Sequence, residues 1–104
     1  MTLYRFSFPI PDYYGEAIFP QFLYVEAENY PTKEQVQEIL LRKHNEDIQY
    51  PEYLQTWNEC LKCLETLEKW PNLRPGLLET NSFCETEKFG QYPFVVEVIV
   101  PERI

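Results

Sequence analysis

The sequence predicts an α+β fold: a single two-layer domain in which a four-stranded, mainly antiparallel sheet carries two helices on one face. Strand-like alternation occurs near both ends of the chain, and helical periodicity occupies the middle. The chain has 104 residues, the usual size of one compact domain. Its 44% apolar and 16% aromatic content is typical of a globular protein. We therefore expect residues 1–104 to form one domain with the element order ββααββ.

Two strands are predicted before the first helix. In residues 3–8, LYRFSF, aromatic side chains alternate with other residues, which is typical of a half-buried strand. Residues 21–28, QFLYVEAE, are rich in aromatic and β-branched residues and form the second. Between them lie several prolines and Gly15, which can supply a turn. The two strands most simply form a hairpin with a long loop.

Two helices are predicted in the middle of the chain. Thr32 and Gln35 have capping-box spacing, so the first helix begins there and ends near His44. The second covers residues 51–70, because proline suits a first helical turn and Pro71 ends the helix. Its apolar residues fall in one stripe about 140° wide: Tyr53, Leu54, Trp57, Cys60, Leu61, Leu64 and Leu67. This stripe should pack against the sheet.

The last third of the chain predicts two further strands. Pro75-Gly76 is a turn signal, and residues 77–84 can form a strand after it. The run PFVVEVIV, residues 93–100, is apolar and β-branched apart from one glutamate, which indicates an interior strand. An interior strand needs neighbours on both sides, so we expect the last strand to lie beside the first.

The cysteines leave two interpretations open. Cys60, Cys63 and Cys84 with His44 could make a tetrahedral zinc set, giving a zinc-stabilised adaptor as an alternative function. Their spacings match no standard zinc module, however, and Cys60 falls in the apolar stripe, where free cysteine behaves as a small hydrophobe. The core interpretation is therefore favoured, with no metal. Three cysteines do not close a disulfide framework, so the cytoplasm is the expected compartment.

The charge balance restricts the partners. Nine Lys+Arg against seventeen Asp+Glu give a net charge of −8, which disfavours direct binding to nucleic acid or to an anionic membrane surface. A basic partner protein fits this charge. The N-terminal run has no basic leader, and no apolar run approaches the roughly 20 residues that span a bilayer. We expect neither a signal peptide nor a membrane segment.

Candidate catalytic groups are sparse. His44 is the one histidine, the three glycines form no phosphate-cradling loop, and no spacing singles out a pair of carboxylates. No serine or cysteine has an evident partner for nucleophilic catalysis. We expect a protein without catalysis and without a cofactor.

Tyrosines near loops and prolines indicate an interaction surface. Two consecutive tyrosines, Tyr13 and Tyr14, cannot both face the core from a regular strand, and exposed tyrosines are common interface anchors. The competing interpretation is that such rings pack over prolines at the ends of the core. The candidate partner-binding residues are Tyr13, Tyr14, Glu16, Tyr30, Tyr50 and Tyr92.

These features predict a binding or regulatory protein that presents an aromatic loop and an acidic surface to a partner protein. One version, argued from charge alone, is a phage-type inhibitor that occupies the basic groove of a nucleic-acid-handling enzyme. A homodimer through an exposed edge strand is a second expected interface, because sheet edges carry unpaired backbone groups.

Overall fold

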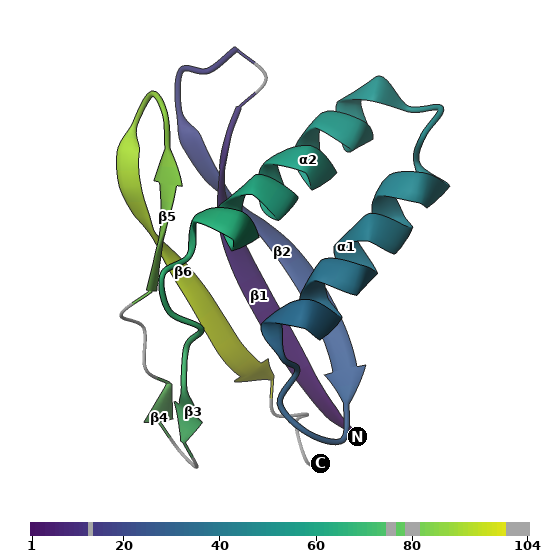
Figure 1. Cartoon of the computed structure of the whole chain (residues 1–104), viewed down its shortest axis with the longest axis vertical. Helices are drawn as coiled ribbons and strands as arrows, with labels where there is room; N and C mark the ends of the chain where they lie inside the picture. The colour runs from purple at the N-terminus through teal and green to yellow at the C-terminus, as the bar shows by residue number, and fades with distance from the viewer. Residues whose placement is uncertain (13, 75–76, 79–81, 100–104) are drawn as a thin grey trace.

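Both helices lie on one face of a four-stranded sheet (Figure 1). The computed structural model describes residues 1–12, 14–74, 77–78 and 82–99. The elements are β1 (Thr2–Pro11), β2 (Ile18–Ala27), α1 (Lys33–Glu46), α2 (Pro51–Thr66), β3 (Leu73–Arg74), β4 (Leu77–Leu78), β5 (Ser82–Thr86) and β6 (Gly90–Ile99). The α+β class and the order ββααββ are confirmed, with the short β3–β4 pair as an addition. No helix in the described ranges is long and apolar enough to cross a membrane.

The strands of the sheet follow the order β2-β1-β6-β5, and every neighbouring pair is antiparallel. The last strand therefore lies beside the first, as predicted. β1 pairs with β2 along its whole length, but it pairs with β6 only from Leu3↔Ile99 to Ser7↔Val95. The other half of β6 pairs with β5, from Ser82↔Phe94 onward. The sheet is consequently staggered, and β1 has no β6 partner beyond Ser7.

Proline explains why the β1–β6 ladder stops there. Pro9 lies opposite Pro20 of β2. Because proline has no N–H, two prolines can face each other only where the paired residues form no hydrogen bonds to each other. At such a position the backbone N–H points away from the partner strand, so the N–H that Pro9 lacks is the one that would bond β6. Continuing the register past Ser7↔Val95 would also set Pro93 opposite Pro9. With no N–H on either side, β1 and β6 separate toward the β1–β2 turn.

The core lies between the sheet and the helices. The predicted inward face of β1 is confirmed, since Tyr4, Phe6 and Phe8 are all buried. The ring of Phe94 in β6 lies 5.0 Å from that of Phe8 and 6.3 Å from that of Phe6, measured between centroids. The helices complete this core with Val36, Leu40, Cys60, Cys63 and Leu64. Burying a large apolar side chain contributes about 1.5–3 kcal/mol, so this layer accounts for much of the stability of the fold.

The predicted start of α1 is confirmed, and the predicted end of α2 is wrong. Thr32 and Gln35 form the predicted capping box at the start of α1, each bonding the backbone N–H of the other. α2 ends at Thr66 rather than at residue 70. Beyond it, Trp70 packs into the core, where its ring lies 5.8 Å from that of Phe6 and its Nε1 donates to the carbonyl of Pro31. This tertiary packing overrides the helical pattern.

The strand predicted for residues 77–84 is two separate elements. Residues 77–78 form β4, residues 82–84 lie in β5, and residues 79–81 lie outside the described ranges. β4 pairs with β3 through Leu73↔Leu78 and Arg74↔Leu77, so it belongs to a second, two-stranded sheet. Only β5 joins the main sheet, at the edge beside β6.

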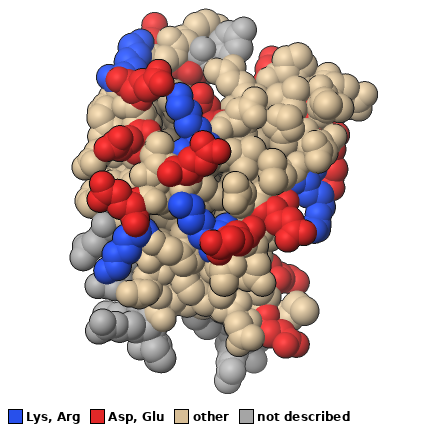
Figure 2. Space-filling model, viewed as in Figure 1, with Lys and Arg blue, Asp and Glu red and all other residues tan. Residues whose placement is uncertain are grey.

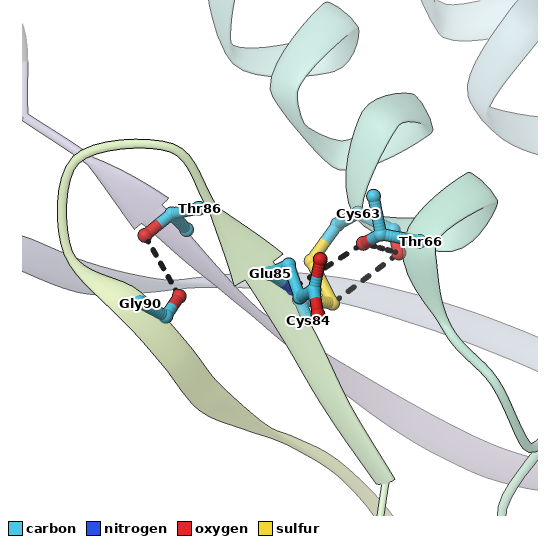
Figure 3. The surroundings of a disulfide bond; sticks show 6 residues. All are labelled: Cys63, Thr66, Cys84, Glu85, Thr86 and Gly90. Atoms are coloured by element: carbon cyan, nitrogen blue, oxygen red, sulfur yellow. Dashed lines mark hydrogen bonds between the residues drawn. A yellow bond between two sulfur atoms is a disulfide. The ribbon is translucent and has the colours of Figure 1, made fainter.

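A disulfide joins the two layers, contrary to the expectation from the cysteine count. Cys63 of α2 and Cys84 of β5 are bonded, with their Cα atoms 5.1 Å apart (Figure 3). Thr66 reinforces the junction, because its Oγ1 accepts a hydrogen bond from the N–H of Glu85. Cys60 is the free cysteine and is fully buried, which confirms the core interpretation. Disulfides are rare in the cytoplasm, so the cysteines no longer favour that compartment.

Candidate partner-binding groove

A groove lies where β1 separates from β6. The β1–β2 turn, the β5–β6 turn and the first half of α2 gather at the same end of the molecule (Figure 1). Between them are two adjoining pockets with volumes of about 330 and 460 Å³. Both are lined by Pro11, Tyr14, Gln55 and Glu59. We call the two pockets together the α2 groove.

The β1–β2 turn forms one wall of the α2 groove. The carboxylate of Asp12 accepts a hydrogen bond from the N–H of Glu16, 2.6 Å away, and its carbonyl accepts one from Gly15. Gly15 has φ of 67°, a left-handed conformation that glycine adopts without steric cost. Lys88 of the β5–β6 turn donates to the carbonyl of Gly15 over 2.6 Å. These bonds set the position of Tyr14, which is 78% exposed.

α2 supplies the second wall and two of the carboxylates that line the groove. Glu52, Gln55 and Glu59 line the groove from one side of the helix, as positions three and four residues apart do. Within the described part of the chain, neither Glu52 nor Glu59 forms an ion pair. Lys62, in contrast, pairs with Glu87 at 3.3 Å. The carboxylates of Glu52 and Glu59 are therefore available to a partner.

The groove as a whole is acidic. Its charged lining residues in the described ranges are Asp12, Glu52, Glu59, Lys62, Glu85, Glu87 and Lys88. Figure 2 shows the helix-bearing face, where carboxylates are widely spread with lysine and arginine groups among them. Both lysines of the groove already bond protein oxygens, one a carboxylate and one a carbonyl. An incoming ligand therefore meets a net negative potential.

Two further tyrosines extend the groove along α2. Tyr50 is 49% exposed and Tyr53 is 56% exposed, and their rings pack edge to face with centroids 5.7 Å apart. They line a shallow depression that shares Glu52 and Gln55 with the α2 groove. Tyr53 had been expected in the core stripe, and that expectation is wrong. Helical periodicity assigns a face to a residue, but it does not show where the sheet beneath the helix ends.

The structure brings some of the predicted partner-binding residues together and separates others. Tyr14 lines the α2 groove, Glu16 bonds Asp12 in the groove wall, and Tyr50 lines the adjoining depression. Tyr13 lies outside the described residues. Tyr30 packs within the fold. Its hydroxyl donates to the carbonyl of Pro71, and its ring stacks on that of Trp70 with centroids 6.1 Å apart. Burial raises the pKa of Tyr30. Tyr92 is half-buried in β6, opposite Cys84.

The structure does not assemble the alternative zinc ligands. Cys63 and Cys84 are bonded to each other, while His44 lies in the last turn of α1. Burial raises the pKa of the Cys60 thiol to about 12, which disfavours the thiolate that a metal requires. In the described ranges, no group of three or more His, Cys, Asp or Glu side chains converges on a point that could hold a metal ion.

Comparison with known proteins adds no family. No family model, no curated protein and no solved structure matches this chain. Function is therefore inferred from the geometry and charge of the groove alone.

Proposed function

We propose that this protein is a non-enzymatic binding protein that holds a basic segment of a partner protein in the α2 groove. The observation that supports this most directly is the pair Glu52 and Glu59, which lie on one side of α2 beside the exposed ring of Tyr14 and form no ion pair with any residue that the structure describes. Arginine matches such a surface in two ways. Its guanidinium bonds carboxylates, and it also stacks on aromatic rings.

The spacing of the carboxylates suggests the form of the segment. Glu52 and Glu59 are seven residues apart in a helix, which corresponds to about 10.5 Å along its axis. In a polyproline-type segment, residues three apart lie on one side of the chain and about 9 Å from each other. Two arginines at this spacing can each reach one of the carboxylates. A short extended segment is therefore a better fit than a folded surface.

The regulatory form of this function is occlusion of a basic, extended segment with which the partner binds another molecule. A nucleic-acid-handling enzyme is one such partner, because its binding surface is basic. The groove charges do not depend on the disulfide between Cys63 and Cys84. The proposal therefore applies in the cytoplasm, which was expected from the sequence, and equally in an oxidising compartment.

A peptide titration tests the proposal. The probe is a fluorescent, proline-rich octapeptide with two arginines three residues apart, and the readout is fluorescence anisotropy at 50 and 300 mM salt. We expect saturable binding that weakens at the higher salt, and at least tenfold weaker binding by the variant Glu52→Gln/Glu59→Gln. Screening of charges over a Debye length of about 10 Å at 0.1 M salt is the reason for the salt effect.

The matched control is Glu34→Gln/Glu38→Gln, which removes the same charge from exposed positions on α1. It should bind the peptide as the unaltered protein does. An equal loss of affinity in both double variants would show that net charge alone attracts the peptide. That result, or no saturable binding at 50 mM salt, rules out the groove as the docking site.

A further inference from the structure

In the described ranges, no helix or strand packs against the face of the sheet opposite α1 and α2, and this face is largely apolar. Along each strand, the residues that alternate with the core residues point to this face. Phe22 is 39% exposed, Tyr24 is 54% exposed and Phe83 is 46% exposed. The residues that make the face apolar, which we call the open sheet face, are Leu3, Phe22, Tyr24, Phe83, Val95 and Ile99. Contiguous apolar patches of this kind mark interaction surfaces.

The open sheet face carries one ion pair near its middle. Arg5 of β1 and Glu97 of β6 are direct neighbours in the register, and the guanidinium lies 2.5 Å from the carboxylate. The two side chains are 27% and 40% exposed, so both remain accessible from outside. In the described ranges, the other charged residues on this face are Glu26 and Glu85, at the outer strands. Most of the net charge of −8 therefore lies elsewhere.

We propose that the open sheet face is a self-association surface on which two copies of the chain pack face to face. A two-fold axis that runs along the strands between β1 and β6 places Arg5 of each copy over Glu97 of the other. The same rotation places β2 of one copy over β5 of the other. The face is thus complementary to itself in charge, as the interface of a symmetric dimer must be.

Charge favours a second copy as the occupant. Two chains of net charge −8 repel each other, and repulsion is least where a cation and an anion face their opposites. Self-association through an exposed edge strand, which is the expectation from the sequence, would leave the apolar face in water. Packing two sheets face to face instead covers it, at a separation of about 10 Å and a strand angle of about 30°.

The open sheet face approaches the size of a standard dimer interface. β1, β2 and β6 have ten residues each and β5 has five. With strands about 4.8 Å apart and about 3.3 Å per residue, their projected area is roughly 550 Å². The accessible surface of a ridged face exceeds its projection, and standard interfaces bury about 800 Å² per partner. This inference does not depend on the α2 groove, which opens at one end of the molecule.

Charge-reversed variants test the proposed geometry by sedimentation equilibrium between about 1 μM and 1 mM, a range that covers weak and strong dimers. We expect the unaltered chain to reach twice its mass of 12.6 kDa. Arg5→Glu and Glu97→Arg should each remain monomeric, because like charges then face across the two-fold axis. An equimolar mixture of the two should form a heterodimer. The double variant Arg5→Glu/Glu97→Arg should dimerise alone.

A second pair of variants covers the case in which a charge reversal prevents folding, which circular dichroism detects. Phe22→Ser should weaken the dimer at least tenfold. Leu41→Ser, at a position on α1 that is 47% exposed, should leave it unchanged. The proposal is overturned if the unaltered chain is monomeric at 1 mM or if the mixed single variants stay monomeric. It is equally overturned if Leu41→Ser dissociates the dimer as Phe22→Ser does.

Discussion

Burial sets the chemistry of Cys60. Its side chain is 0% exposed among the apolar residues between α2 and the sheet. Burial raises the pKa of the thiol from 9.0 to about 12, and the nearby charge of Glu59 adds to the shift. A thiol in this state is protonated at neutral pH, so Cys60 acts as a small hydrophobic residue rather than a nucleophile.

The raised pKa predicts a loss of stability at alkaline pH. Unfolding releases a thiol that ionises near 9, whereas the folded thiol stays protonated to about 12. The contribution of Cys60 is complete below pH 9 and declines as pH rises through this window, by about 1.4 kcal/mol per pH unit. We expect Cys60→Ala to lack this decline. Urea unfolding of both proteins at pH 8, 9 and 10 measures it, and parallel pH profiles would contradict the prediction.

A second residue-scale effect is the row of prolines in the sheet. Pro9, Pro20 and Pro93 can each be located in the sequence, but their alignment depends on the strand register. Pro9 and Pro20 face each other directly. Pro93 would lie opposite Pro9 if the ladder between β1 and β6 continued past Ser7↔Val95. Because proline has no N–H, this alignment separates β1 from β6 and opens the space for the α2 groove.

At the scale of elements, the start of α1 is determined locally. The N–H of Thr32 lies 2.9 Å from Oε1 of Gln35, and the N–H of Gln35 lies 3.2 Å from Oγ1 of Thr32. These bonds satisfy two backbone donors that have no partner within the helix. Both hydrogen bonds could be predicted from the sequence, because Thr32 and Gln35 have the three-residue spacing of a capping box.

The cap predicts a measurable contribution to stability. Thr32→Ala should lower the free energy of unfolding by about 1 kcal/mol, because the N–H of Gln35 loses its acceptor. Thr32→Ser keeps the hydroxyl and should lower the free energy of unfolding by only a few tenths of a kcal/mol. Chemical denaturation of the three proteins compares them. A loss of equal size in both variants would assign the effect to the methyl group of Thr32 instead of the hydrogen bond.

The end of α2 shows the limit of local prediction. Helical periodicity continues through Trp70, yet the helix ends at Thr66. Trp70 gains a hydrogen bond to Pro31 and stacks with Tyr30, both of which precede α1 in sequence. Contacts between residues about forty positions apart thus outweigh the local preference for helix.

For the whole molecule, the disulfide is the covalent link between the helical layer and the sheet. It connects α2 to β5, the edge strand of the sheet, and closes a loop with a sequence separation of 21. Cys63 and Cys84 are 4% and 0% exposed, so the bond is enclosed by the layers it joins. Its position beside the β5–β6 turn also supports one wall of the α2 groove.

Removal of this link should destabilise the fold. A loop of this length corresponds to about 3 kcal/mol in the chain-entropy account of disulfide stabilisation. We expect a reducing agent to lower the urea midpoint of the unaltered protein. The variant Cys63→Ala/Cys84→Ala should start lower and show no response to the reducing agent. Identical midpoints of the unaltered protein with and without reductant would contradict the prediction.

The two surfaces of the molecule differ in character. One end carries the acidic α2 groove with exposed tyrosines, and the open sheet face carries aromatic side chains around the ion pair between Arg5 and Glu97. A chain of net charge −8 can therefore attract a basic segment at one site while it meets a second copy at the other. The two proposals can be tested separately, because their variants alter different residues.

The α+β class, the order of elements, the inward face of β1 and the cap of α1 could all be predicted from the residues alone. Each depends on residues close together in the chain, whose periodicity or spacing carries the information. Only the tertiary structure decided that Cys63 bonds Cys84, that Trp70 leaves the helix, and that the groove and the open sheet face exist. These features depend on where distant elements meet and where one extends beyond another, and local patterns do not encode either.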